Sequence, residues 1–257
     1  MQNILTCDII ITKRKETKEN EMFQEERINF ILEILDKKNR VSVSELSEKL
    51  DVSEVTIRKD LNELEKSKAI KRTHGGAVKI SKNVEELTTD SKKHLNKKQK
   101  DYIADQASKL LEESKTIFLD AGTTTSKLIK HIVKLKDVTV ITYDLEIALI
   151  LSKYPNVKTY ILGGYVDNKT KTSLSIDGYE NLSRFHADVC FMGTDAYDDQ
   201  YVYSTSENKG KIKEKMIENS RVKVLMTDTS KYPSRGLYSF GEVSEFDYLI
   251  SEETRRI

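Results

Sequence analysis

The sequence has few cysteines, no excess of charge of either sign and no long apolar run, and each absence excludes a class of protein. Two cysteines, Cys7 and Cys190, cannot build a disulfide framework or supply a four-thiolate metal site. Lys and Arg total 43 against 42 Asp and Glu, so the net charge of +1 indicates no particular partner. The longest apolar stretches near the start, such as Ile9–Ile11, are too short for a membrane span or a secretory signal. We therefore expect a cytoplasmic protein with no membrane partner.

The composition is nevertheless that of a folded protein. Apolar residues make up 37% and charged residues 33% of the 257 residues, which excludes intrinsically disordered and collagen-like classes. This length suits two modest domains, or one domain built on a single α/β sheet. Residues 1–21 differ from the rest, because a short apolar run is followed by polar residues with no amphipathic stripe. We expect them to be a poorly ordered extension, which a start at Met22 would remove, rather than an edge strand.

Residues 22–80 carry the pattern of a winged helix-turn-helix. In the first helix, apolar residues recur at helical spacing at Ile28, Ile31, Leu32 and Leu35. A second short helix with a cap near Ser44, a turn at Asp51–Val52 and a third helix capped by Ser53 follow. Two short strands around the turn His74–Gly76 complete the wing.

The third helix has a polar face that its apolar core residues do not use, and we predict that this face reads DNA. Arg58 can donate two parallel hydrogen bonds to a guanine edge, while Lys59 suits a phosphate. The segment 66–82 is basic and has no acidic residue, which suits contacts of the wing with the DNA backbone. The alternative is a solvated helix face, as most surface charges form. The candidate DNA contacts are Ser53, Glu54, Val55, Thr56, Arg58, Lys59, Asn62, Lys71, Arg72 and His74.

Residues 81–98 have the composition of a polar, Lys-rich linker, and residues 99–257 alternate between strand-like and helical patterns. Buried-looking runs occur at 116–119, 138–141, 157–162, 189–192, 222–226 and 248–250. Such alternation predicts right-handed crossovers and a mainly parallel sheet that is covered on both faces. The expected fold class is therefore α/β, with an N-terminal winged helix-turn-helix domain before the sheet domain.

The first of these strands runs into a loop suited to an anion, Asp120–Ser126. A tight turn between strand and helix exposes backbone N–H groups, and three threonine hydroxyls add hydrogen bonds for a phosphate or a polyol. The loop lies at the carboxyl end of a strand, where open parallel sheets bind ligands. It is neither a Walker A sequence nor a G-x-G-x-x-G fingerprint, so a nucleotide is not expected. Turns of this kind also occur simply as helix caps.

Together, these motifs closely resemble those of DeoR-family transcriptional regulators. The matching segments are Glu26-Arg27, Val41–Leu46, Val52–Leu61 and His74–Ala77. The resemblance covers almost the whole chain from Met22 onward. It implies a sensor domain similar to ribose-5-phosphate isomerase and CoA-transferase-like folds, which binds a phosphorylated sugar. With the loop and strand-end residues included, the effector-binding candidates are Asp120, Gly122, Thr123, Thr124, Thr125, Gly163, Gly164, Asp195, Glu207 and Lys231. For Gly163-Gly164 a plain turn, and for Lys231 an exposed loop lysine, are the alternatives.

The sequence departs from the family pattern in several places. Lys59 stands where an arginine is usual, and a point charge in place of a fork-shaped donor is expected to loosen a base contact. Lys209 stands where an acidic residue is common, with Glu207 two residues earlier. Tyr165 follows the glycine pair where a basic residue is frequent. The chain also ends soon after residues 249–250, whereas relatives usually continue through another helix and strand.

Two functions fit these features. The first is a repressor whose affinity for double-stranded operator DNA depends on a phosphorylated sugar, acting as a homo-oligomer (dimer or tetramer) on paired half-sites. The second is a sugar-phosphate isomerase or deaminase, with Asp120, Glu207 or Asp228 as the base. No histidine lies in these loops and an enzyme has no need of residues 24–80, so we favour the regulator, with no catalytic residue and no cofactor.

Metal chemistry is not expected either. The four histidines and two cysteines show no ligand spacing. Cys190 stands between Val189 and Phe191, so we expect it to be a buried apolar side chain and not a nucleophile.

Overall fold

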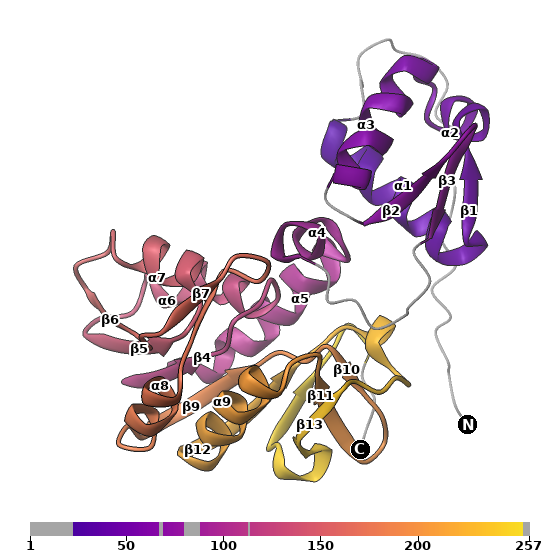
Figure 1. Ribbon diagram of the computed structural model, residues 1–257. Coiled ribbons are helices and arrows are strands. Elements are labelled where there is room, and N and C mark those ends of the chain that lie inside the picture. The colour runs from indigo at the N-terminus through magenta and orange to yellow at the C-terminus, as the bar shows by residue number, and fades with distance from the viewer. Residues whose placement is uncertain (1–22, 67–68, 80–87, 113, 254–257) are drawn as a thin grey trace, which may run out of the picture.

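The computed structural model describes residues 23–66, 69–79, 88–112 and 114–253 (Figure 1). These residues form a winged-helix part (23–79) and a larger α/β part (97–253), joined by a segment that contains the short helix α4 (Thr89–His94). The expected N-terminal extension, residues 1–21, lies outside the described residues. The predicted fold class is confirmed.

The winged-helix part has three helices and a small antiparallel sheet. The helices are α1 (Gln24–Lys38), α2 (Val43–Leu50) and α3 (Glu54–Lys66), and the strands are β1 (Arg40–Ser42), β2 (Ile70–Thr73) and β3 (Gly76–Lys79), in the order β1-β3-β2. The Ser53 hydroxyl accepts a hydrogen bond from the Thr56 N–H at 3.1 Å, as predicted. Helix α2 is capped by Ser42 and not by Ser44. Strand β1 was not predicted, because three residues carry too little periodicity to be recognised.

Two features fix α3 and the wing in place. The Arg27 guanidinium on α1 binds the buried Asp60 carboxylate on α3, with Nε and Oδ2 2.7 Å apart. At the turn of the wing, β3 approaches β1 so closely that a Cβ at Gly76 would lie 1.9 Å from the Val41 carbonyl oxygen. A glycine is therefore required at that position.

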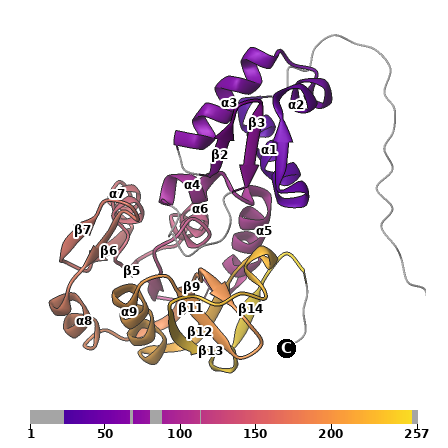
Figure 2. The ribbon, with the colours of Figure 1, turned by 45° about the vertical axis from the view of Figure 1, so that its right-hand side comes forward.

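The α/β part is built on a six-stranded parallel sheet in the order β14-β12-β9-β4-β5-β6. Its strands are β4 (Thr116–Leu119), β5 (Val138–Thr142), β6 (Val157–Ile161), β9 (Ala187–Met192), β12 (Ser220–Met226) and β14 (Tyr248–Ile250). One face packs against α5 (Lys97–Ala107), α6 (Ile129–Ile132) and α7 (Leu145–Leu151). The other packs against α8 (Ile176–Leu182) and α9 (Glu207–Glu218) (Figures 1 and 2). The predicted parallel sheet, covered on both faces, is thus confirmed.

Cys190 lies fully buried in the second of these cores, as expected of an apolar side chain. Burial raises the pKa of its thiol to about 11, so the thiolate that a nucleophile needs is scarce at neutral pH.

Several elements were not predicted from the sequence. A small antiparallel sheet consists of β10 (Ala196–Tyr197), β11 (Tyr201–Ser204) and β13 (Tyr238–Glu242), and a hairpin consists of β7 (Tyr165–Asp167) and β8 (Thr172–Leu174). Short 3-10 turns, η1 (Ser108–Leu110), η2 (Thr125–Leu128), η3 (Thr229–Lys231) and η4 (Val243–Glu245), complete the fold. Most of these pieces lack the runs of apolar residues that marked the strands of the parallel sheet.

Helix α4 falls within residues 81–98, which the sequence assigned to a linker. It has almost no apolar residues, and polar contacts hold it on the α/β part: the Thr89 hydroxyl donates to the Thr170 carbonyl at 2.8 Å. Leu95, just after it, packs against the core of the winged-helix part. Both ribbon views show α4 between the two parts (Figures 1 and 2).

Candidate functional site

The outward face of α3 carries the side chains expected to read DNA. Val55, Arg58, Lys59 and Asn62 are exposed along it, and Glu54 begins the helix. The Arg58 guanidinium binds the Glu54 carboxylate at 3.0 Å, and both side chains remain half exposed, at 48% and 50%. A solvent-exposed pair of this kind is worth little, so Arg58 can leave it for a base edge. Ser53 and Thr56 are engaged in the cap, where their hydroxyls lie 2.9 Å apart.

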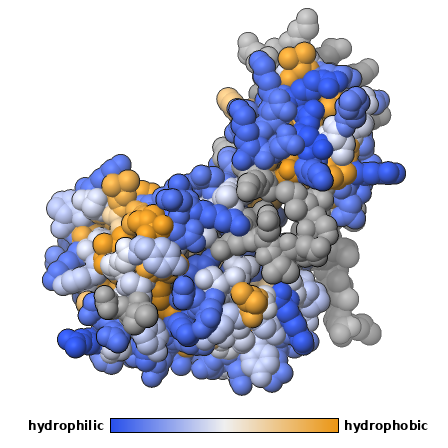
Figure 3. Space-filling model, viewed as in Figure 1, coloured by the Kyte–Doolittle hydropathy of each residue, from blue (hydrophilic) through white to orange (hydrophobic). Residues whose placement is uncertain are grey.

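The wing lies against the same helix. The Arg72 guanidinium on β2 donates to the Arg58 carbonyl at 3.5 Å, while Lys71 and His74 are exposed. Hydrophilic residues cover most of this part of the surface in Figure 3. The structure therefore brings the predicted helix and wing residues to neighbouring positions, in the arrangement that groove and backbone contacts require.

A second site lies at the carboxyl ends of the central strands β4, β5 and β9. A cavity of about 60 Å³ is present there, which is room for about four water molecules or a phosphoryl group. It is lined by Thr89, Lys92, Ala121, Gly122, Thr123, Thr124, Thr125, Tyr143, Thr170, Thr172, Gly193, Thr194, Asp195, Lys209, Lys213 and Lys231. Of the predicted effector residues, six line it: Gly122, Thr123, Thr124, Thr125, Asp195 and Lys231.

Asp120 lies fully buried beneath the cavity and holds its floor together. Its carboxylate accepts hydrogen bonds from the Tyr143 hydroxyl at 2.6 Å and the Gly193 N–H at 2.8 Å, and it binds the Lys213 ammonium. Burial, and after it the Asp120 charge, raises the pKa of the Tyr143 phenol well above its usual value. With these donors in place, Asp120 organises the site and does not act as a free base on a ligand.

The threonine loop differs from the expected helix N-terminus. It continues into the 3-10 turn η2 and the four-residue helix α6, so the helix dipole behind it is small. The Thr125 hydroxyl donates within the loop, to the Asp120 carbonyl at 2.7 Å. The positive potential of the cavity must therefore come from side chains.

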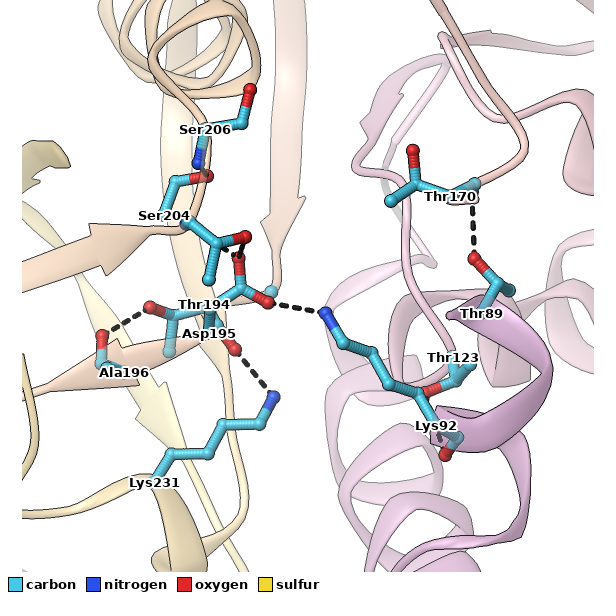
Figure 4. A network of polar contacts seen from close by, with 12 residues as sticks. Thr89, Lys92, Thr123, Thr170, Thr194, Asp195, Ala196, Ser204, Ser206 and Lys231 are labelled. Carbon is cyan, nitrogen blue, oxygen red and sulfur yellow. Dashed lines mark hydrogen bonds and ion pairs between the residues drawn. The ribbon is translucent and has the colours of Figure 1, made fainter. Parts of the chain in front are cut away.

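Lysines supply that potential. Lys92 reaches the cavity from α4 and binds Asp195 with Nζ and Oδ1 2.6 Å apart, and Lys231 donates to the Thr194 carbonyl at 2.6 Å (Figure 4). Burial opposes ionisation of Asp195, but Lys92, Lys213 and Lys231 outweigh it and hold the pKa of this carboxyl well below its usual value. Asp195 therefore stays charged while the ammonium groups around it are close enough to receive an anion.

Two further lysines have strongly perturbed environments. Burial, and then the charge of Lys213, lowers the pKa of Lys209 to about 7. Burial, and then the charge of Lys231, lowers the pKa of Lys100 to about 7; its ammonium donates to the Lys92 carbonyl behind the cavity. An anion that enters the cavity would favour the charged form of Lys209 and so gain a strong hydrogen bond.

Three predicted effector residues lie outside the cavity. Glu207 is exposed, because its position on α9 turns it to solvent. Its Oε1 lies 2.6 Å from Lys211 Nζ. Gly163 lines a separate hollow between β6 and α8. Gly164 has φ +151°, and a Cβ there would lie 2.2 Å from the Leu174 carbonyl oxygen. The structure thus gives Gly164 a packing role, next to β8.

This role gives a direct prediction for the glycine pair. Gly164→Ala should lower the free energy of unfolding by about 1–3 kcal/mol, because the new Cβ meets a backbone oxygen at a positive φ. Gly163→Ala is the matched control, since nothing lies within 4 Å of its Cβ position. Urea denaturation of both variants measures the difference, and equal midpoints for the two would contradict this explanation.

The sequence did not identify several residues that line the cavity. They are Thr89, Lys92, Tyr143, Thr170, Thr172, Lys209 and Lys213. Only Lys209 and Lys213 had a recognisable signal: their spacing of four residues places two lysines on one helix face, and that face is buried. The others come from a supposed linker, an unpredicted hairpin and strand ends.

Within the part of the chain that the structure describes, no group of three or more His, Cys, Asp or Glu side chains is placed to hold a metal ion. None of the helices described combines the length and the apolar character that crossing a bilayer requires.

Comparisons with known proteins identify the family of both parts of the chain. A family model for the DeoR C terminal sensor domain matches residues 95–253, and one for the DeoR-like helix-turn-helix domain matches residues 27–83. The HTH-type transcriptional repressor GlcR of Bacillus subtilis is 31% identical, over 90% of this chain and 89% of the relative. The HTH-type transcriptional regulator GolR of Listeria innocua is 34% identical, over 90% of this chain and 91% of the relative.

Among solved structures, ribose 5-phosphate isomerase A from Methanocaldococcus jannaschii is similar over 53% of this chain and 54% of that chain. The TM-score is 0.39 and the sequence identity is 18%.

Proposed function

This chain belongs to the DeoR family of DNA-binding transcriptional regulators, and we propose that it represses genes of carbohydrate metabolism under the control of a phosphorylated sugar. The observation that carries the proposal is the lysine-lined cavity at the carboxyl ends of β4, β5 and β9. Four lysine side chains and several threonine hydroxyls line it, a combination that suits a phosphoryl group attached to a polyol.

The alternative of an isomerase or deaminase is not supported. The relatives are transcriptional regulators, and an enzyme would need a base with a free lone pair over the substrate. Asp120 already accepts from Tyr143 and Gly193 and binds Lys213. Glu207 is turned to solvent, and neither Glu207 nor Asp228 lines the cavity. The arrangement favours binding without turnover.

Helix α4 is the element that we propose to couple the two sites. Lys92, which lines the cavity, lies on α4, so a ligand that enters the cavity meets a side chain of this helix. The Lys92–Asp195 pair, which joins α4 to the loop after β9, is partly exposed and is the contact that an entering anion would compete for. Since Leu95 packs on the winged-helix core, movement of α4 would bias the placement of α3.

A homo-oligomer, dimer or tetramer, is part of the proposal. A single winged helix presents one recognition helix, and paired half-sites require at least two copies. An apolar surface over α7, β6 and β7, visible in Figure 3, offers a place for self-association. Its exposed side chains are Leu149, Ile150, Ile161 and Val166. We propose that the oligomer acts in the cytoplasm on double-stranded operator DNA.

A thermal-shift screen over phosphorylated sugars, followed by gel-shift titration, tests the function. An effector at about a hundred times its Kd should add about 2.7 kcal/mol to the stability of the protein. Thr123→Val should abolish the effector-induced change in DNA affinity but keep operator binding, because it removes a cavity hydroxyl far from α3. Thr116→Val, at the amino end of β4, is the matched control. If the effector releases DNA from Thr123→Val as readily as from the parent, the cavity is not the effector site.

A further inference from the structure

The parallel sheet ends at an open edge, strand β6, and we propose that two copies of the chain pair there through antiparallel β6 strands, which joins their sheets into one. This inference rests on the homo-oligomer of the proposed function and assigns an interface to it. Among the described strands, β6 has β5 as its one neighbour in the sheet. A strand edge of this kind is a template on which another strand can pair.

The backbone groups of β6 that point away from β5 follow from two hydrogen bonds. The Leu162 N–H donates to the Thr142 carbonyl of β5 at 2.9 Å, and the Asn156 carbonyl accepts from β5 at 3.4 Å. Alternate residues of a strand direct their N–H and C=O groups to the same side, so the even-numbered residues of 156–162 face β5. Thr159 and Ile161 therefore direct their N–H and C=O groups outward.

Antiparallel pairing about a twofold axis at Thr159 satisfies these outward N–H groups. The Thr159 residues of the two copies exchange both backbone hydrogen bonds, and the Ile161 N–H of each copy donates to the Val157 carbonyl of the other. The same register places Lys158 opposite Tyr160 of the other copy, so a cation faces an aromatic ring and no like charges stand directly opposite.

Lys158 does not block this edge, although a lysine on an edge strand commonly prevents pairing. Its Nζ lies 5.0 Å from the centroid of the Tyr160 ring in the same copy. Lys158 and Tyr160 are two residues apart and so share one face of the sheet. The charge therefore lies along that face, where it can also reach the Tyr160 ring of a second copy.

Thr159 supplies an independent observation. In the part of the chain that the structure describes, its Oγ1 is a buried side-chain oxygen without a hydrogen-bond partner. Such atoms are rare in native folds and call for an explanation. At the twofold axis the two Thr159 side chains stand opposite each other on one face of the joined sheet. A rotation about the Cα–Cβ bond would then let the two hydroxyls hydrogen-bond to each other.

The side chains beside the edge favour contact with a second copy over contact with water. Leu149 and Ile150 on α7 are 67% and 40% exposed, and Ile161 on β6 is 44% exposed. They belong to the apolar region over α7, β6 and β7 in Figure 3, and exposed apolar patches mark protein interfaces. Figure 1 shows β6 on the side of the α/β part away from the winged-helix part, so pairing there leaves α3 of both copies accessible to DNA.

Sedimentation velocity over a series of concentrations of the full chain tests the interface. Ile161→Lys places a charge at the centre of the apolar contact, and the Kd of self-association should rise about tenfold or more. Because Ile161 is already partly exposed, the variant should fold as the parent does. Leu237→Lys is the matched control, since Leu237 is also an exposed apolar residue but lies before β13. It should associate as the parent does.

Disulfide cross-linking tests the register. A Cys7→Ser background leaves Cys190 as the remaining native thiol, and Cys190 is buried. In this background, an equal mixture of Lys158→Cys and Tyr160→Cys should form a linked dimer under mild oxidation, because the two positions are direct neighbours across the strands. Each variant alone should stay unlinked. Linkage of Tyr160→Cys to itself would place the twofold axis at Tyr160 and overturn the register.

The remaining outcomes separate this inference from the proposed function. If the parent is an oligomer but Ile161→Lys associates as tightly as the parent, or if the cysteine mixture does not link, the β6 interface is wrong and the proposed function stands with another interface. If the parent is a monomer at every concentration, with and without operator DNA, the homo-oligomer of the proposed function falls and this inference with it.

Discussion

Asp120→Ala is expected to lower the free energy of unfolding of the α/β part by about 3–5 kcal/mol, the cost of breaking a buried ion pair from one side. The Asp120 side chain is 0% exposed and that of its partner Lys213 is 6% exposed. Removing the carboxylate leaves a buried ammonium without a counter-ion. It also removes the acceptor of the Gly193 N–H and the Tyr143 hydroxyl, and buried donors without partners add to the loss.

Urea denaturation followed by circular dichroism measures this effect. The winged-helix part has its own core and should keep its transition, which serves as an internal reference. The double variant Asp120→Ala, Lys213→Met should recover a large part of the loss, because no unpaired charge remains. If the free energy of unfolding of Asp120→Ala lies within about 1 kcal/mol of the parent value, the Asp120–Lys213 pair does not support the fold.

Arg58→Ala is expected to weaken operator binding by about 1–3 kcal/mol and to relax the preference for one base pair. Arg58 is the exposed residue on α3 that can donate two hydrogen bonds to one guanine, and its exposed pair with Glu54 offers little competition. The substitution lies on the surface, so stability and ligand binding by the α/β part should remain as in the parent.

Fluorescence anisotropy at fixed salt, with an operator obtained by selection from random duplexes, gives the affinities. Lys59→Ala is the matched control on the next residue, also exposed. If Lys59 contacts a phosphate, its loss should weaken binding to all DNA sequences about equally and lower the slope of affinity against salt concentration by about one. Equal affinity of Arg58→Ala and the parent for the selected operator would exclude Arg58 as a base-reading residue.

The parts of the fold that depend on near neighbours could be predicted from the sequence. The Ser53 cap, the turn before Gly76 and the apolar spacing of α1 and α3 involve residues a few positions apart, so local rules describe them. The alternation of apolar strands and helices predicted the parallel sheet for the same reason. Elements such as β1, α4 and the β7–β8 hairpin escaped, because they lack the run of apolar residues that marked the equally short strand β14.

The residues of the candidate sites also fall into those that a local pattern predicted and those that tertiary packing brings together. By itself, the sequence determined the exposed polar face of α3 and the threonine loop after β4, since each is one continuous segment with its own pattern. Only the tertiary structure decided that Lys92 from the supposed linker and Lys209 from α9 share one cavity with that loop, and that Glu207 and the glycine pair do not. The physical reason is that strand order and helix rotation, set by packing across the whole sheet, bring distant charges together, and no local pattern of residues records that outcome.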